Sequence, residues 1–239
     1  VRKAVELGYR LVDTATIYGN EEGVGEALEG RDDIFLTTKV WNSDQGHDQT
    51  LRAFELSAGK LRREVIDLYL IHWPAPRNDR YVDTWRALVR LQSEGRIRSI
   101  GVSNFYPEHL ERIIGETGVT PAVNQVELHP RFQQRSLRDV HQARAIATEA
   151  WSPLGQGQVL QDPVITRLAS KHGRTPAQII IRWHLDSGLI VIPKSSNPGR
   201  LAENLDVFGF VLDADDLAAI GALDDGDGRI GPDPMTAAF

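Results

Sequence analysis

The chain has 239 residues, of which 41% are hydrophobic and 25% charged, and it contains no cysteine. The lack of cysteine excludes a disulfide framework, a thiolate nucleophile and thiolate metal ligands. A formal net charge of −6 argues against general binding of nucleic acid. No apolar run reaches the roughly 18 residues of a membrane span, and no signal peptide is recognised before the first helical pattern. We therefore expect a cytoplasmic protein without a nucleic-acid or membrane partner.

Short apolar runs alternate with helical patterns along most of the chain. The runs that predict strands are residues 10–12, 34–38, 68–71, 99–102, 122–126, 146–150 and 189–192. The patterns that predict helices are residues 51–61, 83–92, 107–114, 137–143, 164–171, 176–186 and 213–223. This alternation is typical of a parallel α/β sheet with helical crossovers, and the strands are apolar throughout, as strands buried on both faces are.

The beginning of the chain does not fit a complete barrel. Residues 1–7 form an amphipathic helical pattern that ends at Gly8 and has no strand before it. A closed (β/α)8 barrel needs eight strands, and the pattern offers seven. Either the first strand is missing from this chain or the sheet is open; we favour the first, because an open parallel edge exposes unpaired backbone groups. Residues 1–239 are thus expected to form a single α/β domain.

Hydrogen-bonding side chains stand where the predicted strands end. They are Asp13, Lys39, His72, Ser103, Asn104, Gln125, Glu127, Trp151, Ser152, Lys194 and Ser195. In a barrel these side chains converge at one end, where such enzymes keep their active sites. A Lys in a buried run needs a carboxylate partner, and Asp13 is the natural one for Lys39. Taken singly, Asp13 is more often a turn cap and His72 reads equally well as a core histidine, but together with Tyr18 they favour an acid/base site.

Seven ordered motifs carry a resemblance to a known family. They are GYRLVDTATIYGNE, LTTKVW, DLYLIHWP, IGVSNF, VNQVELHP, AWSPLGQG and IPKSSNPGRLAENL. Over residues 1–224 the chain resembles the aldo-keto reductases, most of all the bacterial members similar to 2,5-diketo-D-gluconate reductase. The resemblance implies a (β/α)8 TIM barrel, here without its opening hairpin and first barrel strand, a monomeric state, and NADPH as cofactor. It also implies a catalytic tetrad, which falls on Asp13, Tyr18, Lys39 and His72.

The four tetrad side chains suit the reduction of a carbonyl by hydride. This reaction forms an alkoxide, so the site needs a proton donor and a group that polarises the C=O bond. Tyr18 is suited to be the proton donor, and Lys39 can supply a cation beside its phenol. Asp13 keeps Lys39 charged and oriented. His72 hydrogen-bonds the carbonyl oxygen.

Other side chains suit the parts of NADPH. Amide-binding groups for the nicotinamide are Ser103, Asn104 and Gln125. Trp151 offers a ring for stacking, with a plain core aromatic as the alternative. The glycine-containing loop after it can approach the pyrophosphate, and the residues of this loop expected to bind the cofactor are Ser152, Leu154 and Gln156. The 2′-phosphate would meet the basic and hydroxyl groups of one loop, which are Lys194, Ser195, Ser196 and Arg200. By resemblance, the adenine contacts are Glu203 and Asn204.

Three functions are weighed. The first is NADPH-dependent reduction of a small carbonyl, such as a diketogluconate-like or methylglyoxal-like compound, in a pocket walled by Trp41 and Trp73. The second is an NADP(H)-binding module that is catalytically silent. The third is a metal-dependent barrel hydrolase, whose ligands would be Asp13, His72, Glu127 and His129. The third is disfavoured because Lys39 and Tyr18 would stand where ligands are needed, and no metal is expected.

Overall fold

The computed structural model describes residues 1–237, which fall into two compact units. The first unit contains Val1–Asn124, Val140–Ile146 and residues 233–237. The second contains Gln125–Asp139 and Ala147–Pro232. Strand β5 (Val123–Glu127) and helix α6 (Arg135–Ala143) are each divided between the two units.

The first unit is built from parallel strands with helices between them. Its strands are β1 (Leu11–Asp13), β2 (Phe35–Val40), β3 (Ile66–Ile71) and β4 (Ile97–Ser103). Its helices are α1 (Arg2–Leu7), α2 (Glu21–Ala27), α3 (His47–Leu61), α4 (Tyr81–Ser93) and α5 (Pro107–Thr117), with 3-10 turns at Thr16–Tyr18, Asn42–Asp44 and Pro76–Asn78. The strands pair in chain order, with Asp13 opposite Thr37 and Lys39 opposite Leu70. This parallel register places the carboxyl ends of β1, β2 and β3 side by side at one end of the sheet.

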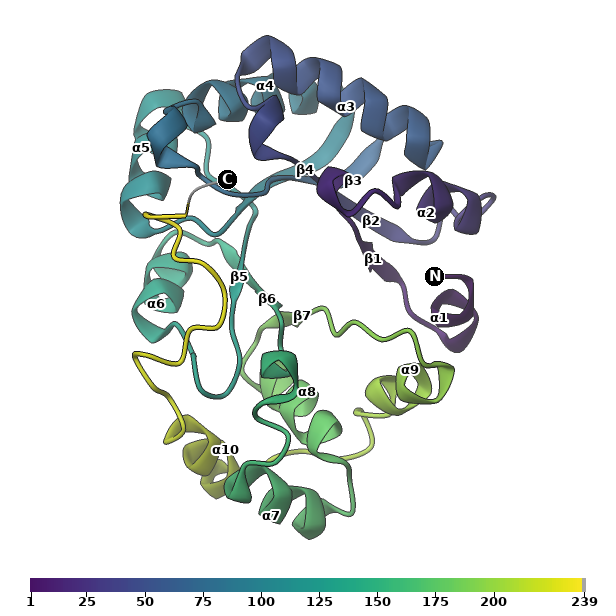
Figure 1. Cartoon of the computed structure of the whole chain (residues 1–239), viewed down its shortest axis with the longest axis vertical. Coiled ribbons are helices and arrows are strands. Elements are labelled where there is room, and N and C mark those ends of the chain that lie inside the picture. The colour runs from purple at the N-terminus through teal and green to yellow at the C-terminus, as the bar shows by residue number, and fades with distance from the viewer. Residues whose placement is uncertain (238–239) are drawn as a thin grey trace. The chain divides into compact units, whose positions relative to one another are not determined.

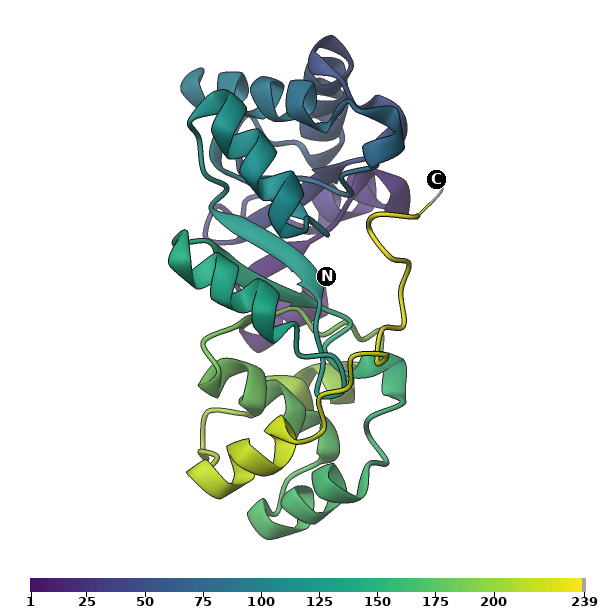
Figure 2. The same ribbon diagram turned by 90° about the vertical axis from the view of Figure 1, so that its left-hand side faces the viewer.

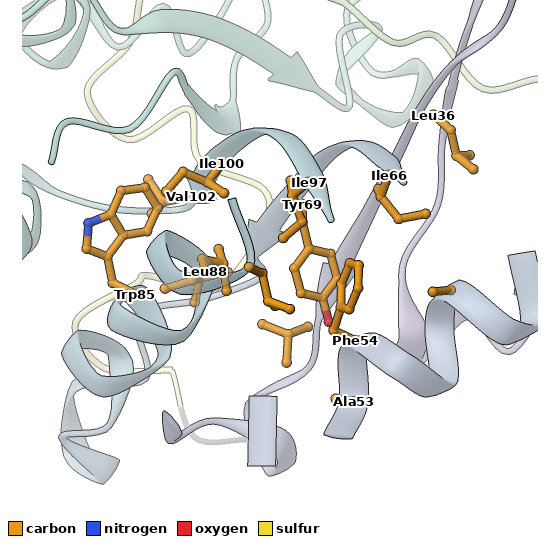
Figure 3. Packing of buried hydrophobic residues seen from close by; sticks show 14 of the residues in the cluster. Leu36, Ala53, Phe54, Ile66, Tyr69, Trp85, Leu88, Ile97, Ile100 and Val102 are labelled. Carbon is orange, nitrogen blue, oxygen red and sulfur yellow. The ribbon is translucent and has the colours of Figure 1, made fainter. Parts of the chain in front are cut away.

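Helices α3 and α4 cover one face of strands β2 to β4 (Figure 1) and bury the core of the first unit against it. The rings of Phe54 and Tyr69 meet edge to face with centroids 5.4 Å apart (Figure 3). Trp85 of α4 is fully buried in the same cluster. Aromatic rings in this geometry add about 0.5–1.5 kcal/mol to the free energy gained from burial of their area. The core therefore fixes the strands whose ends carry the candidate site.

The second unit has its own strands, helices and core. It contains β6 (Ala147–Trp151), β7 (Ile190–Val191), a 3-10 turn (Gly155–Gly157), and the helices α7 (Pro163–His172), α8 (Pro176–Asp186), α9 (Pro198–Leu205) and α10 (Ala214–Gly221). Strand β6 runs parallel to β7, with Ala150 opposite Val191. Helices α7 and α10 lie side by side (Figure 2), and Ile220 is fully buried.

The structure confirms an α/β fold with parallel strands, and it corrects the predicted element bounds at several places. Helix α3 begins at His47 rather than at residue 51, because its first turn is polar and lacks the apolar stripe on which the prediction rested. Strand β7 is shorter than residues 189–192. Two helices carry side-chain caps at their first turns, since Thr175 accepts a hydrogen bond from the backbone amide of Gln178, and Asp213 accepts one from that of Asp216. Within residues 1–237, no helix combines the length and apolar composition of a membrane span.

Candidate active site

A buried ion pair joins two neighbouring strand ends in the first unit. The side chain of Lys39 is fully buried, and its Nζ lies 2.5 Å from Oδ1 of Asp13. The same ammonium donates a hydrogen bond of 3.0 Å to the carbonyl oxygen of Thr14. A buried cation without such partners would be very costly, so the pairing that the sequence predicted has a clear physical reason.

Tyr18 lies beside this pair on the turn between β1 and α2. The Nζ of Lys39 is 5.3 Å from the centroid of the Tyr18 ring. The turn is tied to β2, because Oγ1 of Thr16 donates a hydrogen bond of 2.9 Å to the carbonyl oxygen of Lys39. Tyr18 is 51% exposed, so a small molecule can reach its ring. The result is an accessible phenol held next to a buried cation.

His72 follows β3 directly and completes the cluster. Its ring lies edge-on to that of Tyr18, with the centroids 5.8 Å apart, and edge-on to that of Trp41 at 5.0 Å. Burial, together with the nearby charge of Lys39, lowers the pKa of His72 to about 3. The imidazole is therefore neutral at physiological pH. Its Nδ1 atom is buried and has no hydrogen-bond partner among the described residues.

The four predicted tetrad residues thus come together within one unit of the structure. Trp41, predicted to wall the substrate pocket, is half-buried beside His72. Trp73 is buried, and its backbone carbonyl oxygen accepts a hydrogen bond of 2.7 Å from the side-chain Nε2 of Gln45. The cluster therefore combines a carboxylate, a cation, a phenol and a neutral imidazole next to an indole ring.

Two of the predicted cofactor residues also belong to the first unit. Ser103 ends β4, and Asn104 follows it in a left-handed conformation with φ of 64°. The side-chain Nδ2 of Asn104 donates to Oγ of Ser103 at 3.0 Å and to the backbone carbonyl oxygen of His72 at 2.9 Å. Residues held in this backbone region tend to occur at ligand sites, and Asn tolerates it better than most residues.

The other predicted cofactor residues belong to the second unit. Gln125 is buried in β5, and Trp151 is the last residue of β6. In the loop that follows, Ser152 and Gln156 have positive φ values of 48° and 51°. Leu154 precedes the turn that contains Gln156. Left-handed residues turn their backbone amides in directions that a regular strand or helix does not offer, which suits a loop that meets phosphate oxygens.

The predicted phosphate-binding loop leads into α9. Asn197 caps this helix by accepting hydrogen bonds from the amides of Gly199 and Arg200, at 2.8 Å and 3.2 Å. Lys194 and Arg200 are exposed, and neither makes an ion pair within residues 1–237. Cations without a protein partner are suited to a ligand that carries negative charge.

The remaining predicted residues of this loop and helix differ in exposure and in hydrogen-bond partners. Ser195 interacts with the backbone of Asn197, and Ser196 is exposed. Glu203 accepts a hydrogen bond of 2.9 Å from the hydroxyl of Thr175, which caps α8, and Asn204 is buried. Glu203 therefore links two helices in addition to any contact with a ligand.

The sequence interpretation missed Thr16 and Asn197. Thr16 gave no local signal, because its partner is a carbonyl oxygen on another strand. Asn197 could have been found, since Asn directly before Pro198 is a strong combination of helix cap and first-turn residue.

The model of the Aldo/keto reductase family matches residues 1–225. The chain belongs to the aldo/keto reductase family. The resemblance expected from the sequence is thereby confirmed.

Individual members of the aldo/keto reductase family match over nearly the whole chain. Methylglyoxal reductase DkgA of Escherichia coli is 55% identical over 240 residues, which are 98% of this chain and 86% of that protein. Crystal structures of Gox0644, in the apo form and as a mutant in complex with NADPH, are 65% identical with a TM-score of 0.99, covering 100% of this chain and 88% of theirs. A structure described as a candidate 2,5-diketo-D-gluconic acid reductase B is 36% identical with a TM-score of 0.92, covering 97% and 84%.

Proposed function

We propose that the chain is an NADPH-dependent oxidoreductase that reduces a small aldehyde or ketone to the alcohol. The observation that carries the proposal is the buried pair of Lys39 and Asp13 beside the exposed ring of Tyr18. The similarity to a methylglyoxal reductase supports a small carbonyl as substrate, and the Gox0644 mutant in complex with NADPH supports the cofactor.

The chemistry of the proposed reaction follows from the tetrad. NADPH, when bound, supplies the hydride. Tyr18 donates its phenolic proton to the oxygen that becomes the alcohol, and the cation of Lys39 stabilises the phenolate that remains. Asp13 holds Lys39 in place for this role. Because His72 is neutral, it donates a hydrogen bond to the substrate oxygen and leaves the proton transfer to Tyr18.

The residues of the second unit fit a phosphorylated cofactor. Lys194, in the loop before α9, and Arg200, in its first turn, carry exposed positive charges that would hold the 2′-phosphate. The left-handed backbone at Ser152 and Gln156 would meet the pyrophosphate. Trp151 would stack against the nicotinamide, to whose amide Gln125 would bind.

Replacement of the phenolic hydroxyl tests the catalytic assignment. The variant Tyr18→Phe is expected to lose about 10²–10⁴-fold in kcat, because the general acid is absent, while its Kd for NADPH stays near that of the wild type. NADPH consumption with methylglyoxal and with a diketone measures turnover. Tyr9→Phe, the same change outside the tetrad, is the control. Near-normal turnover by Tyr18→Phe would refute the role of this residue.

Replacement of one loop cation tests the phosphate assignment. The variant Arg200→Ala is expected to bind NADPH about 10–100-fold more weakly, the loss of a charge-assisted hydrogen bond, and to bind NADH unchanged. Arg167→Ala, an exposed arginine on α7, is the matched control. An unchanged preference for NADPH over NADH would remove Arg200 from the site.

The alternative, a cofactor-binding but silent module, predicts a different result in the same assay. Such a protein would bind NADPH tightly and consume none of it with any carbonyl.

We also propose that the enzyme is a cytoplasmic monomer. Size-exclusion chromatography tests the oligomeric state, and elution at the mass of a dimer would contradict it.

A further inference from the structure

The carboxylate of Glu127 lies buried at the end of β5, outside the tetrad. Its side chain is fully buried and meets Nε2 of His129 at 3.2 Å. Its oxygens also accept backbone hydrogen bonds from a distant part of the chain, Oε1 from Ile230 at 2.6 Å and Oε2 from Gly231 at 2.8 Å. The carboxylate therefore has one imidazole and two backbone amides as partners.

The three hydrogen bonds keep Glu127 charged. Burial alone would raise the pKa of this carboxyl, but the bonds from His129, Ile230 and Gly231 more than offset burial, and the pKa lies below its ordinary value. The carboxylate is therefore ionised at neutral pH. Hydrogen bonds from amides to an ionised acceptor are roughly twice as strong as those between neutral groups.

Residues 228–231, here called the strap, follow the surface of the loop after β5. The guanidinium of Arg229 lies 4.6 Å from the centroid of the Phe132 ring. A Cβ atom on Gly228 would collide with the carbonyl oxygen of Arg131, so only glycine permits this close approach. Just before the strap, the amide of Asp225 donates to that same carbonyl at 3.1 Å. The strap is thus fixed along its length within the second unit.

The end of the strap touches the ring proposed to hold the nicotinamide. A Cβ atom on Gly231 would lie 2.5 Å from Cη2 of Trp151 and 2.9 Å from Oε2 of Glu127. Real Cβ atoms essentially never come this close to another heavy atom, so the backbone of Gly231 is packed directly on the edge of the indole. The same glycine donates its amide to Glu127, which links the buried carboxylate to the indole.

We propose that Glu127 is a positioning residue, which holds the strap against Trp151 and thereby fixes the plane on which the nicotinamide stacks. This inference rests on the proposed function, because it concerns the cofactor of that reaction. Glu127 touches neither substrate nor cofactor; it acts through the backbone of Ile230 and Gly231. The carboxylate that a metal hydrolase would use as a ligand serves instead as the anchor of a segment more than 100 residues later in the chain.

The first experiment measures the strap in the cofactor-free protein. In Glu127→Gln the amide replaces one acceptor oxygen by a donor, so one of the two strap amides loses its partner. We expect hydrogen exchange at the amide that loses its acceptor, Ile230 or Gly231, to become at least tenfold faster than in the wild type. Unchanged exchange would show that Glu127 does not hold the strap.

The second experiment measures the effect of the strap on the cofactor. Gly231→Ala is expected to raise the Kd for NADPH about tenfold, because the added methyl displaces the Trp151 ring. Gly226→Ala is the matched control, since a Cβ atom there meets nothing within 4 Å, and its Kd should stay within twofold of the wild type. In a Trp151→Phe background, which lacks Cη2, Gly231→Ala should have a much smaller effect than in the wild type.

The outcomes separate this inference from the proposed function. Tight NADPH binding by the wild type and equally tight binding by Gly231→Ala would overturn the role of the strap and leave the reductase proposal standing. The same loss of affinity in the Trp151→Phe background would assign the effect to general damage and would also overturn the role. Failure of the wild type to bind NADPH would end both proposals, whatever the exchange rates show.

Discussion

Acidification should destabilise the protein through His72 in a way that can be calculated. Burial and the charge of Lys39 hold the pKa of His72 at about 3 in the folded state, against 6.5 for the ordinary side chain. As the pH falls below 6.5, the unfolded chain takes up a proton that the folded site refuses. Stability from this group is therefore complete above pH 6.5 and is lost as the pH falls from there toward 3.

The size of the effect follows from the proton linkage. A pH of 5 is about 1.5 units below the pKa of His72 in the unfolded chain. Each unit corresponds to about 1.36 kcal/mol, so His72 contributes about 2 kcal/mol to the loss of unfolding free energy. Burial also lowers the pKa of His141 and of His184 to about 4, and these residues add losses of the same sign. A comparison of wild type with a variant of His72 cancels the contribution of the other histidines.

The assay is denaturant unfolding of the wild type and of His72→Gln at pH 7.5 and pH 5.0. We expect the loss of unfolding free energy between the two pH values to be about 2 kcal/mol smaller in the variant. NMR of the wild type gives a reading that does not depend on the variant, since the His72 ring should not titrate between pH 8 and 5. Equal losses in both proteins, or a His72 resonance that titrates near pH 6.5, would refute the reasoning.

Two further predictions concern packing and positioning. Gly25→Ala should lower the free energy of unfolding by about 1–3 kcal/mol, because its Cβ atom would lie 2.5 Å from the backbone oxygen of Lys60. Gly23→Ala in the same helix meets nothing within 4 Å and should raise it by about 0.5–1 kcal/mol; thermal unfolding measures both, and a stable Gly25→Ala would contradict the first. Thr16→Val removes the hydrogen bond that ties the Tyr18 turn to β2, and should lower kcat about tenfold with unchanged Kd for NADPH. Steady-state kinetics checks this, and a change in Kd alone would contradict it.

The sequence predicted the strand ends well because their chemistry is local. An apolar run that stops at an Asp, a Lys or a His places that residue at the carboxyl end of a parallel strand, and the register of β1, β2 and β3 brings those ends to one edge. The cost of burying the ammonium of Lys39 then names Asp13 as its partner. The position of the Tyr18 side chain does not follow from the strand pattern, because Tyr18 lies on a turn that is held to β2 through Thr16.

The anchor at Glu127 could not be predicted in this way. Its partners are backbone amides of Ile230 and Gly231, and a backbone amide has no residue identity that a sequence can reveal. From the sequence, Glu127 and His129 were named only as two of the four ligands of a disfavoured metal hydrolase; the structure shows their side chains in contact. Long-range contacts from side chain to backbone are therefore the part of this site that needed coordinates.

The exposed charges of the loop before α9 and of the first helical turn have a practical consequence for binding measurements. Lys194 and Arg200 face water, so dissolved salt screens them, whereas the buried pair of Lys39 and Asp13 is shielded from it. Inorganic phosphate and sulfate would compete for the same two cations. Under the proposed assignment of these two cations to the cofactor phosphate, buffers of low ionic strength without either anion give the strongest NADPH binding, and added phosphate weakens it steeply.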